Sequence, residues 1–511
     1  MSLRIQCVGA EPHRVIRYAA EELERYLSRM GAAGSGEIQI GLASHFEMIQ
    51  PFPVADAALD DAIEVDVRGG QGHIAGGNPR SVLLAVYRYL TELGCRWVRP
   101  GAEGELIPAL ESLPDVRLRE TPSYRHRGVC IEGSLSVDHA RDIIDWMPKL
   151  GLNAYFIQFR EAHTFFDRWY AKHDQPSSKA PSISLEQARG HTRRVVEEIE
   201  KRGLVYHAVG HGWTCEPFGI SGTGWEKEAS EPPENIRQYL AEVKGERRLW
   251  HGIALNTNLC YGNPEVRRTV IQEIAGYADQ HREIDVLHFW LADGSNNHCE
   301  CSLCRDTSPA DFYVQMLNQL DVLLGASGLS TKIVFLIYVD LLWPPMQDRL
   351  KNPDRFILMF APITRTYASS FALRGELPPL PPFQRNQLEF PKSVESNLAF
   401  LAAWQTQFSG DSFDFDYHLM WDYLLDPGQT RISRILFEDV KNLAGIRLNG
   451  LVSCQSQRVF FPNSLAMTAM GAALWNSGAD YQKLAFEYHT AAYGPDGSLV
   501  LEYLHRLTEL F

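Results

Sequence analysis

The chain has 511 residues, of which 45% are hydrophobic and 11% aromatic, and its formal net charge is -14 at pH 7. The hydrophobic fraction supports large buried cores and excludes intrinsic disorder. The acidic balance, without a block rich in lysine or arginine, excludes nucleic acid as the expected partner, because phosphate recognition needs a basic face.

The first section, residues 1–118, predicts a small α/β domain. Residues 13–30 place apolar side chains on one helical face, and residues 37–40 and 63–67 alternate as half-buried strands do. A second helix precedes Gly94. This section contains no cluster of catalytic residue types, so we expect it to be a structural module.

From about residue 124, strand and helix patterns alternate along the chain. The expected strands are residues 128–131, 154–159, 205–209, 286–291, 332–339, 356–360, 412–420 and 450–454. Eight such units over residues 119–460 fit a (β/α)₈ barrel with inserted loops. A doubly wound sheet would alternate in the same way, but no Gly-x-Gly-x-x-Gly follows the early strands. Residues 461–511 predict a C-terminal helical segment.

Polar and aromatic side chains gather where these strands end, and the carboxyl ends of the strands carry the active site in a (β/α)₈ barrel. The candidate catalytic carboxylates are Asp293, Glu132, Asp340 and Asp416. The candidate substrate contacts are Arg160, His211, Trp213, Asn258, Tyr338, Trp343, Tyr417, Trp421 and Gln455. Each carboxylate could instead cap a helix or pair with a cation. As a set, carboxylates and aromatics with few lysines fit glycoside hydrolysis of a carbohydrate substrate, without a catalytic cofactor.

Nine cysteines are scattered through the chain, an odd number that does not predict a disulfide framework. Cys299, Cys301 and Cys304 lie in the expected loop after the fourth strand, and Cys260 ends a segment of the preceding loop. Four thiolates in adjacent loops could hold a closed, tetrahedral structural zinc ion. Reduced thiols are the alternative, with one disulfide if the protein is exported, and Cys215 is an alternative fourth ligand.

Several segments resemble known hydrolases. Residues 77–97, with Ile107-Pro108 after them, resemble the domain that precedes the barrels of α-glucuronidases and β-hexosaminidases. Residues 258–266, with Asp293 and the cysteine cluster, resemble a bacterial group of barrel proteins. That group includes glycoside hydrolase family 163, whose members are endo-β-N-acetylglucosaminidases acting on N-glycans.

The resemblance implies a retaining hydrolase assisted by the 2-acetamido group of its own substrate. One carboxylic acid would protonate the leaving oxygen, and a second carboxylate would orient the acetamide. Related acetamido-sugar enzymes carry adjacent acidic residues after the fourth strand, whereas here Gly294 follows Asp293. The second carboxylate therefore has to come from another strand, such as Glu132 or Asp340.

Three alternatives stay open at this point. An α-glucuronidase-like enzyme would aim a basic residue, Arg160 or Arg365, at the uronic acid. A carbohydrate-binding barrel that has lost catalysis would bind sugar without turnover. A metal-dependent hydrolase would place His207 and His211 with carboxylates around an open metal ion.

The first residues show no basic region followed by an apolar one, so no secretory signal is expected. No run of about 18 apolar residues predicts a membrane span. The expected location is the cytoplasm, where such an enzyme would process imported oligosaccharides. The sequence does not determine the oligomeric state.

Overall fold

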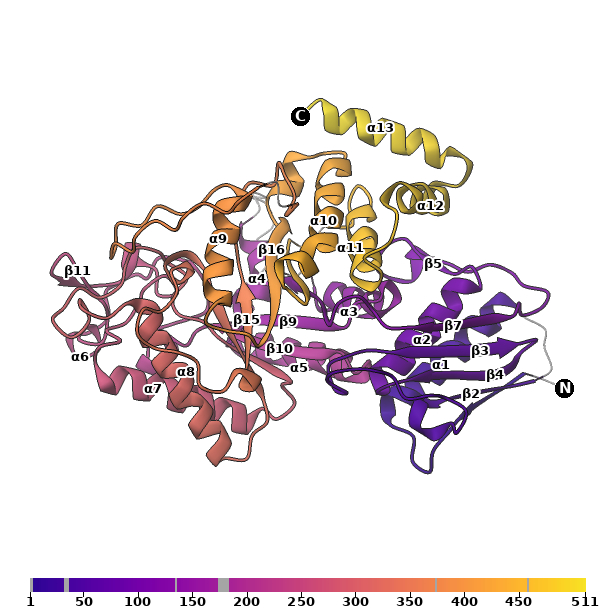
Figure 1. Cartoon of the computed structure of the whole chain (residues 1–511), viewed down its shortest axis with the longest axis horizontal. Helices are drawn as coiled ribbons and strands as arrows, with labels where there is room; N and C mark the ends of the chain where they lie inside the picture. Colours follow the sequence, from indigo (N-terminus) through magenta and orange to yellow (C-terminus); the bar gives the residue numbers. More distant parts are fainter. Residues whose placement is uncertain (1–2, 32–35, 134–135, 173–182, 373–374, 457–458) are drawn as a thin grey trace.

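The computed structural model describes residues 3–31, 36–133, 136–172, 183–372, 375–456 and 459–511. It consists of a small sheet domain, a closed barrel and a group of C-terminal helices (Figure 1). The predicted (β/α)₈ barrel with an α/β domain before it and helices after it is therefore confirmed.

The N-terminal domain is a five-stranded mixed sheet in the order β1-β2-β4-β3-β7. Its strands are β1 (Leu3–Cys7), β2 (Gly36–Leu42), β3 (Ile63–Arg68), β4 (Gln71–Gly76) and β7 (Val116–Glu120). Helices α1 (Arg14–Met30) and α2 (Pro79–Glu92) contact each other and the sheet, so they cover the same face of it. Asn78 caps α2 by accepting a hydrogen bond from the Ser81 backbone N–H, as a residue before a helix-starting proline commonly does.

Eight parallel strands close the barrel in the order β8-β9-β10-β13-β14-β15-β16-β17. They are β8 (His126–Ile131), β9 (Ala154–Phe159), β10 (Val205–His211), β13 (Val286–Phe289), β14 (Lys332–Ile337), β15 (Phe356–Phe360), β16 (Asp411–Leu419) and β17 (Gly450–Gln455). β17 pairs with β8 along its whole length, from Gly450 opposite His126 to Gln455 opposite Ile131, which completes the ring. Every strand predicted from residue 128 onward is present.

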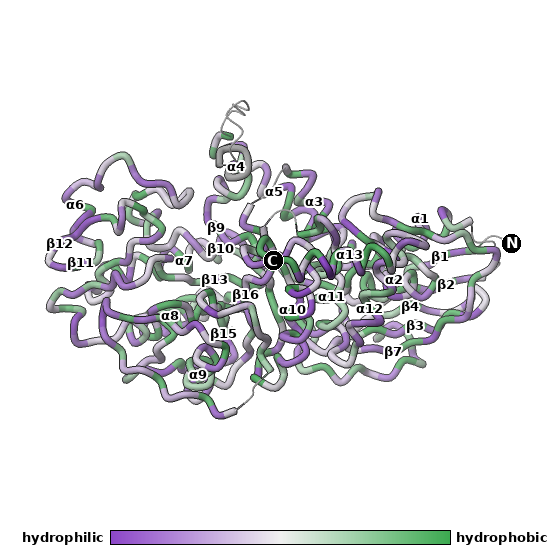
Figure 2. The backbone as a smooth tube through the Cα atoms, turned by 90° about the horizontal axis from the view of Figure 1, so that it is seen from above, coloured by the Kyte–Doolittle hydropathy of each residue, from purple (hydrophilic) through white to green (hydrophobic). Residues whose placement is uncertain are grey.

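Helices surround most of the barrel. They are α3 (Val137–Trp146), α4 (His163–Lys172), α5 (Leu185–Lys201), α7 (Pro264–Gln280), α8 (Pro309–Ala326), α9 (Val394–Gln405) and α10 (Thr430–Asn442). The connection between β14 and β15 is made instead by two short 3₁₀ turns, η6 (Val339–Leu342) and η7 (Pro353–Arg355). Figure 2 shows hydrophobic and hydrophilic segments alternating along the whole chain. Strands that are covered on both sides are buried on both faces, and every residue of β8, β9, β10 and β15 is buried accordingly.

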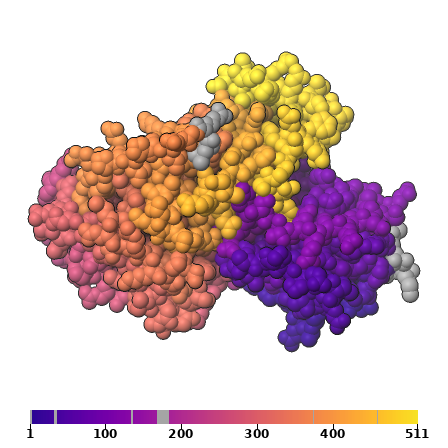
Figure 3. All heavy atoms as spheres, viewed as in Figure 1, coloured from indigo at the N-terminus to yellow at the C-terminus, as the bar shows by residue number. Residues whose placement is uncertain are grey.

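The C-terminal helices α11 (Leu465–Trp475), α12 (Tyr481–Tyr493) and α13 (Gly497–Glu509) lie over the junction of the barrel and the N-terminal domain (Figure 3). A buried ion pair also joins these two parts. Asp61 of the sheet domain accepts hydrogen bonds from Arg127 of β8 at 2.7 Å and from Asn153 at 3.0 Å. Among the described residues, no helix combines the length and apolar character that crossing a membrane requires.

Candidate active site

A cavity of about 210 Å³ opens at the carboxyl ends of the barrel strands. Its lining residues are Glu132, Gln158, His211, Trp225, Trp290, Leu291, Ala292, Asp293, Leu336, Tyr338, Met359, Ile363, Phe415, Tyr417 and Trp421. Six of the predicted site residues are in this set, namely Asp293, Glu132, His211, Tyr338, Tyr417 and Trp421. The place where the barrel fold predicts chemistry is therefore a hollow with carboxylates and aromatic side chains in its wall.

Asp293 is held in place by contacts from two directions. Its backbone N–H donates to the Leu255 carbonyl at 2.9 Å, which ties the loop after β13 to the loop after β10. Its Oδ2 accepts a hydrogen bond from Nε1 of Trp225 at 2.8 Å. Trp225 lies in the long connection after β10, where no sequence pattern marked it, so sequence reasoning missed it.

Glu132 reaches the same cavity from a strand that is not adjacent to the strand that carries Asp293. It follows β8, which is separated from β13 by the two strands β9 and β10 in the ring of eight. Tyr338, after β14, interacts electrostatically with both Asp293 and Glu132. Burial, followed by the negative charge of Asp293, raises the pKa of Tyr338 well above its usual range, so its hydroxyl keeps its proton and can donate it in a hydrogen bond.

The backbone is strained at two points beside this cavity. Val209 has φ 54° and Val339 has φ 41°, a region that β-branched residues rarely occupy. Val209 lies at an irregularity in the pairing of β10 with β9, and the irregularity directs His211 toward the cavity. Val339 directly follows Tyr338. Such strain persists only where the surrounding structure enforces it, and it gathers at functional sites.

Two buried side chains bring polar hydrogens to the cavity without a partner in the described part of the chain. They are Nε2 of Gln158, a side chain 2% exposed, and Nε1 of Trp290. Buried donors normally have a partner, so these two are available for the hydroxyl groups of a ligand. Burial also lowers the pKa of His211, against the opposing effect of Asp293, so this imidazole is neutral near pH 7.

An aromatic surface forms the outer wall of the cavity. The rings of Tyr417 and Trp421 are stacked, with centroids 5.7 Å apart and planes 5° from parallel. Tyr417 is buried, whereas Trp421 is 48% exposed. A flat aromatic face at the rim of a polar cavity can pack against the apolar face of a sugar ring.

Asp340 does not line the cavity. It lies in η6, 2% exposed, and both of its carboxylate oxygens accept from the backbone N–H of Asn296 at 3.0–3.1 Å. It therefore fixes the loop that carries Asp293. Burial raises the pKa of Asp340 to about 6.

Asp416 points away from the cavity, because successive side chains of a strand alternate between its faces. Phe415 and Tyr417 of β16 line the cavity, while Asp416 faces a buried ion cluster on the outer side. There it accepts a hydrogen bond from Tyr367 and lies 3.4 Å from Nε of Arg365. The remaining members of this cluster are Asp414, His418 and Asp439.

The other predicted contacts are in structural positions outside the cavity lining. Arg160 pairs with Glu216 and Glu273. The remaining four side chains are buried and have partners of their own. Trp213 donates to the His288 carbonyl, and Trp343 donates to the Pro381 carbonyl. Asn258 accepts from Tyr261, and Gln455 contacts the sulfur of Met467.

His207 and His211 do not form a metal site in the structure. His207 is fully buried inside the barrel and lies 3.0 Å from His288 through their ring nitrogens, whereas His211 lines the cavity above. Burial lowers the pKa of His207 to about 3, so it stays neutral. Two groups of potential metal ligands occur among the described residues, and neither contains either histidine. The metal-dependent alternative is therefore not supported by the geometry.

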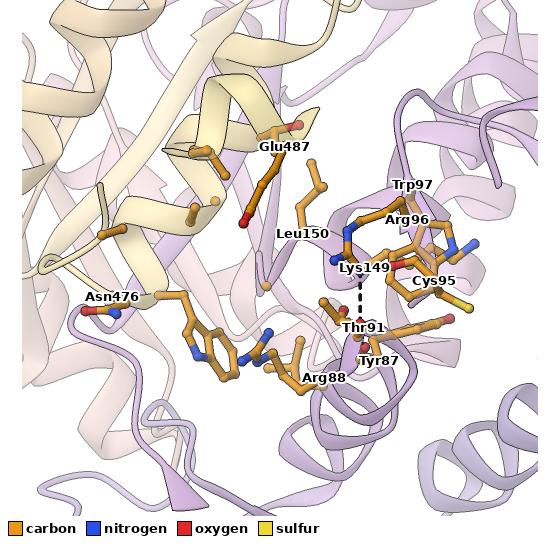
Figure 4. Close-up of a pocket in the computed structure, with 18 of the residues that line it drawn as sticks. Tyr87, Arg88, Thr91, Cys95, Arg96, Trp97, Lys149, Leu150, Asn476 and Glu487 are labelled. Atoms are coloured by element: carbon orange, nitrogen blue, oxygen red, sulfur yellow. Dashed lines mark hydrogen bonds between the residues drawn. The ribbon is translucent and has the colours of Figure 1, made fainter. Parts of the chain in front are cut away.

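A larger cavity of about 720 Å³ lies at the junction of α2, the 3₁₀ turn η3 (Met147–Leu150), α11 and α12 (Figure 4). Its principal charged groups are already paired: Arg88 with Glu120 at 3.0 Å, and Lys149 with Glu105 at 3.0 Å. Its lining includes Ser123 and Gly151, which precede β8 and β9, so it lies near the amino ends of these strands. We therefore regard it as a seam between domains, and place the chemistry in the smaller cavity.

Comparison with known proteins supports the architecture. No family model and no curated protein sequence matches the chain. Among solved structures, it is similar to a GH138 enzyme described as targeting pectin rhamnogalacturonan II. The TM-score is 0.58 at 9% identity, over 99% of this chain and 55% of the other, so the chain spans about half the length of that protein.

A second similar structure is that of CpGH84B, with a TM-score of 0.51 and 12% identity, over 98% of this chain and 72% of the other. At these identities the likeness shows a shared fold. The resemblance to family 163 inferred from sequence has no counterpart in these comparisons.

Proposed function

We propose that this protein is a glycoside hydrolase whose essential carboxylates are Asp293 and Glu132. The observation that carries the proposal is that these two acidic side chains enter one cavity from strands on different sides of the barrel. Glycosidases place two carboxyl groups across the scissile bond, one as a proton donor and one as an anion. The fold shared with the GH138 enzyme and CpGH84B is consistent with this chemistry.

The contacts of Asp293 suggest its role. Asp293 accepts a hydrogen bond from Trp225 and interacts with the protonated hydroxyl of Tyr338. We assign Asp293, whose carboxylate these two side chains hold in place, as the group that stabilises or attacks the developing positive charge of the sugar, and Glu132 as the acid that protonates the leaving oxygen.

The shape of the site fits one sugar ring at the point of cleavage. A cavity of about 210 Å³ lies below the range of about 300–1,000 Å³ that is usual for larger ligands. Gln158 and Trp290 would donate to hydroxyl groups of the sugar ring in the cavity. The face of Trp421 would support the next sugar unit of the chain, outside the cavity. The substrate class is therefore an oligosaccharide, and the resemblance of residues 258–304 makes an N-acetylglucosaminide the first choice.

Gly294, directly after Asp293, bears on whether two adjacent acidic residues could act together here. A Cβ at Gly294 would lie 2.3 Å from the Asn256 carbonyl oxygen and 2.8 Å from Nδ2 of Asn297. The packing leaves no room for an adjacent acidic side chain. If the 2-acetamido group of the substrate assists the reaction, a single carboxylate, that of Glu132 or of Asp293, must orient this group without an acidic neighbour in the sequence.

An α-glucuronidase would need a basic side chain in the cavity wall to bind the carboxylate of a uronic acid. No arginine or lysine belongs to the cavity wall among the described residues. Arg160 is engaged by Glu216 and Glu273, and Arg365 by Asp416 and Asp439. A uronic acid carboxylate would therefore meet no positive charge here.

The test is hydrolysis of a panel of 4-nitrophenyl glycosides and N-glycan-derived oligosaccharides by the full chain. Asp293→Asn is expected to lose about a hundredfold to a thousandfold in kcat on every substrate, the size of effect seen when a main electrostatic contributor is removed. Glu132→Gln is expected to lose as much on natural oligosaccharides but far less on 4-nitrophenyl substrates, whose leaving group needs no protonation. Asp340→Asn, outside the cavity, should retain turnover.

Two results would count against the proposal. Full activity of Asp293→Asn on a genuine substrate would remove the central carboxylate. Sugar binding by the wild-type protein without turnover on any member of the panel would favour a non-catalytic carbohydrate-binding barrel.

A further inference from the structure

We propose that Cys260, Cys299, Cys301 and Cys304 bind one structural zinc ion, which fastens together the two loops that carry Trp225 and Asp293. This site lies outside the cavity, and the zinc ion would touch neither the substrate nor the proposed catalytic carboxylates. It therefore stands or falls independently of the enzymatic proposal.

The four sulfur atoms already have the spacing of a zinc site. Sγ of Cys260 is 3.6 Å from Sγ of Cys301 and 3.7 Å from Sγ of Cys304, and all four Sγ atoms lie within 4.8 Å of one another. Four thiolates about 2.3 Å from a tetrahedral zinc ion lie about 3.8 Å apart. Three of the four cysteines are buried and Cys301 is partly buried, so the site is closed, as structural sites are.

Backbone N–H groups are directed at two of the sulfur atoms. The Gly262 N–H donates to Sγ of Cys304 at 3.1 Å, and the Glu242 N–H donates to Sγ of Cys299 at 3.3 Å. Hydrogen bonds of this kind orient metal ligands and stabilise their negative charge. Gly262 is also required by space, since a Cβ there would lie 2.4 Å from the Leu303 carbonyl oxygen.

Three arginines lie around the cluster and provide positive charge to balance the negative charge of a zinc ion bound by four thiolates. The complex of one zinc ion and four thiolates carries two negative charges. Arg247 and Arg267 interact electrostatically with the sulfur atoms of the cluster. Arg385 donates to the carbonyls of Cys299 at 3.1 Å and Cys304 at 3.0 Å, so its charge lies beside the loop that contains three ligands.

The ligands come from two different connections. Cys260 ends the long loop after β10, just before α7, and the other three cysteines lie in the loop after β13, before α8. The Trp225–Asp293 hydrogen bond joins the same two loops at the cavity. Between the two points, the Asn258 N–H donates to Oδ1 of Asn297 at 2.9 Å. A metal at the far end would make this pair of loops one rigid unit, which is what precise placement of Asp293 requires.

The first experiment measures metal in the full chain, purified without added metal and without a histidine tag. Elemental analysis and native mass spectrometry are expected to show one zinc ion per chain. Titration of the thiols with a mercurial reagent should release that zinc to a colorimetric chelator. These measurements need neither a variant nor a substrate, so they decide the site even if no hydrolysis is found.

The second experiment compares Cys301→Ser with Cys215→Ser. Cys215 is buried in the same long loop, and its thiol contacts only the Gly212 carbonyl among hydrogen-bond partners in the described structure, at 3.6 Å. Cys301→Ser is expected to lose its zinc and to melt at a lower temperature, whereas Cys215→Ser should keep stoichiometric zinc.

The proposal is overturned if wild-type protein contains no zinc and its four thiols titrate freely. It is equally overturned by two disulfides in the native mass or by stoichiometric iron in place of zinc. If Cys301→Ser does not fold, the wild-type measurements remain decisive.

Discussion

The indole Nε1 of Trp225 donates to Oδ2 of Asp293 at 2.8 Å, across 68 positions of sequence. Trp225 comes from the loop after β10 and Asp293 from the end of β13, so the contact exists only when both loops are folded. It fixes the direction of the carboxylate that we place at the centre of the chemistry.

Trp225→Phe removes this donor and keeps most of the ring. The packing of Trp225 against Phe159 and His211, with centroids 5.3 and 5.2 Å away, should survive. Loss of one hydrogen bond to a charged group costs about 1.5–3 kcal/mol, so kcat/KM should fall roughly 10- to 150-fold. The melting temperature should change little. Trp250→Phe, in the same loop outside the cavity, is the control, and equal activity of the two variants would show that the contact does not matter.

Val339→Gly should make the protein more stable and less active. The valine occupies φ 41°, a strain of about 1–3 kcal/mol, which glycine relieves at an entropic cost of about 0.5–1 kcal/mol. A net gain of about 1 kcal/mol in the free energy of unfolding is expected. Tyr338 would then be held less firmly, and kcat should fall.

The matched control is Val322→Gly, at a 70% exposed position of α8. Glycine within a helix destabilises it, so this variant should lose roughly 0.5 kcal/mol. Chemical denaturation measures both changes. A destabilised Val339→Gly protein would mean that the conformation at this residue is not strained.

Asp61→Asn should weaken the interface between the sheet domain and the barrel and so lower the free energy of unfolding. Arg80 and Arg127 lower the pKa of Asp61 in spite of its complete burial, so the carboxylate is charged. Breaking a buried pair leaves the arginines without compensation, at a cost of about 3–5 kcal/mol. Asp66→Asn removes an exposed pair with Arg68 and should cost less than about 1 kcal/mol. Similar denaturation midpoints for the two variants would contradict this account.

Asp340→Asn should change how stability depends on pH. Burial raises the pKa of Asp340 in the folded protein to about 6, above its ordinary value of about 3.9 in an unfolded chain. Asp340 therefore contributes to the free energy of unfolding of the wild-type protein below about pH 4, where it is protonated. This contribution is lost as the pH rises through 6. Two pKa units correspond to about 2–3 kcal/mol.

The asparagine variant carries no such penalty and can still accept a hydrogen bond from Asn296. Relative to wild type, it should be more stable at pH 8 than at pH 4, by up to that amount. Denaturant titrations at the two pH values measure the difference. A constant difference between the proteins across this range would show that Asp340 does not titrate as described.

The sequence alone determined the barrel and its eight strands. Short apolar runs alternated with helical periods, and local hydrophobic patterning is dictated by which face of each element must be buried. The rule that chemistry lies at the carboxyl ends of barrel strands then identified Asp293, Glu132 and Tyr338 as site candidates. The cysteine spacing likewise indicated that four thiols could meet, because Cys260 and the Cys299–Cys304 segment belong to neighbouring loops, but it left Cys215 open as the fourth ligand.

The tertiary structure alone decided which candidates face the cavity. The sequence of β16 alternates Asp414, Asp416 and His418 with Phe415, Tyr417 and Leu419, so it shows two different faces without showing which of them points into the barrel. Trp225 could not be found either, because a long loop has no periodicity and its path depends on distant contacts. Its position beside Asp293 is a property of the folded barrel, where loops remote in sequence converge at one end.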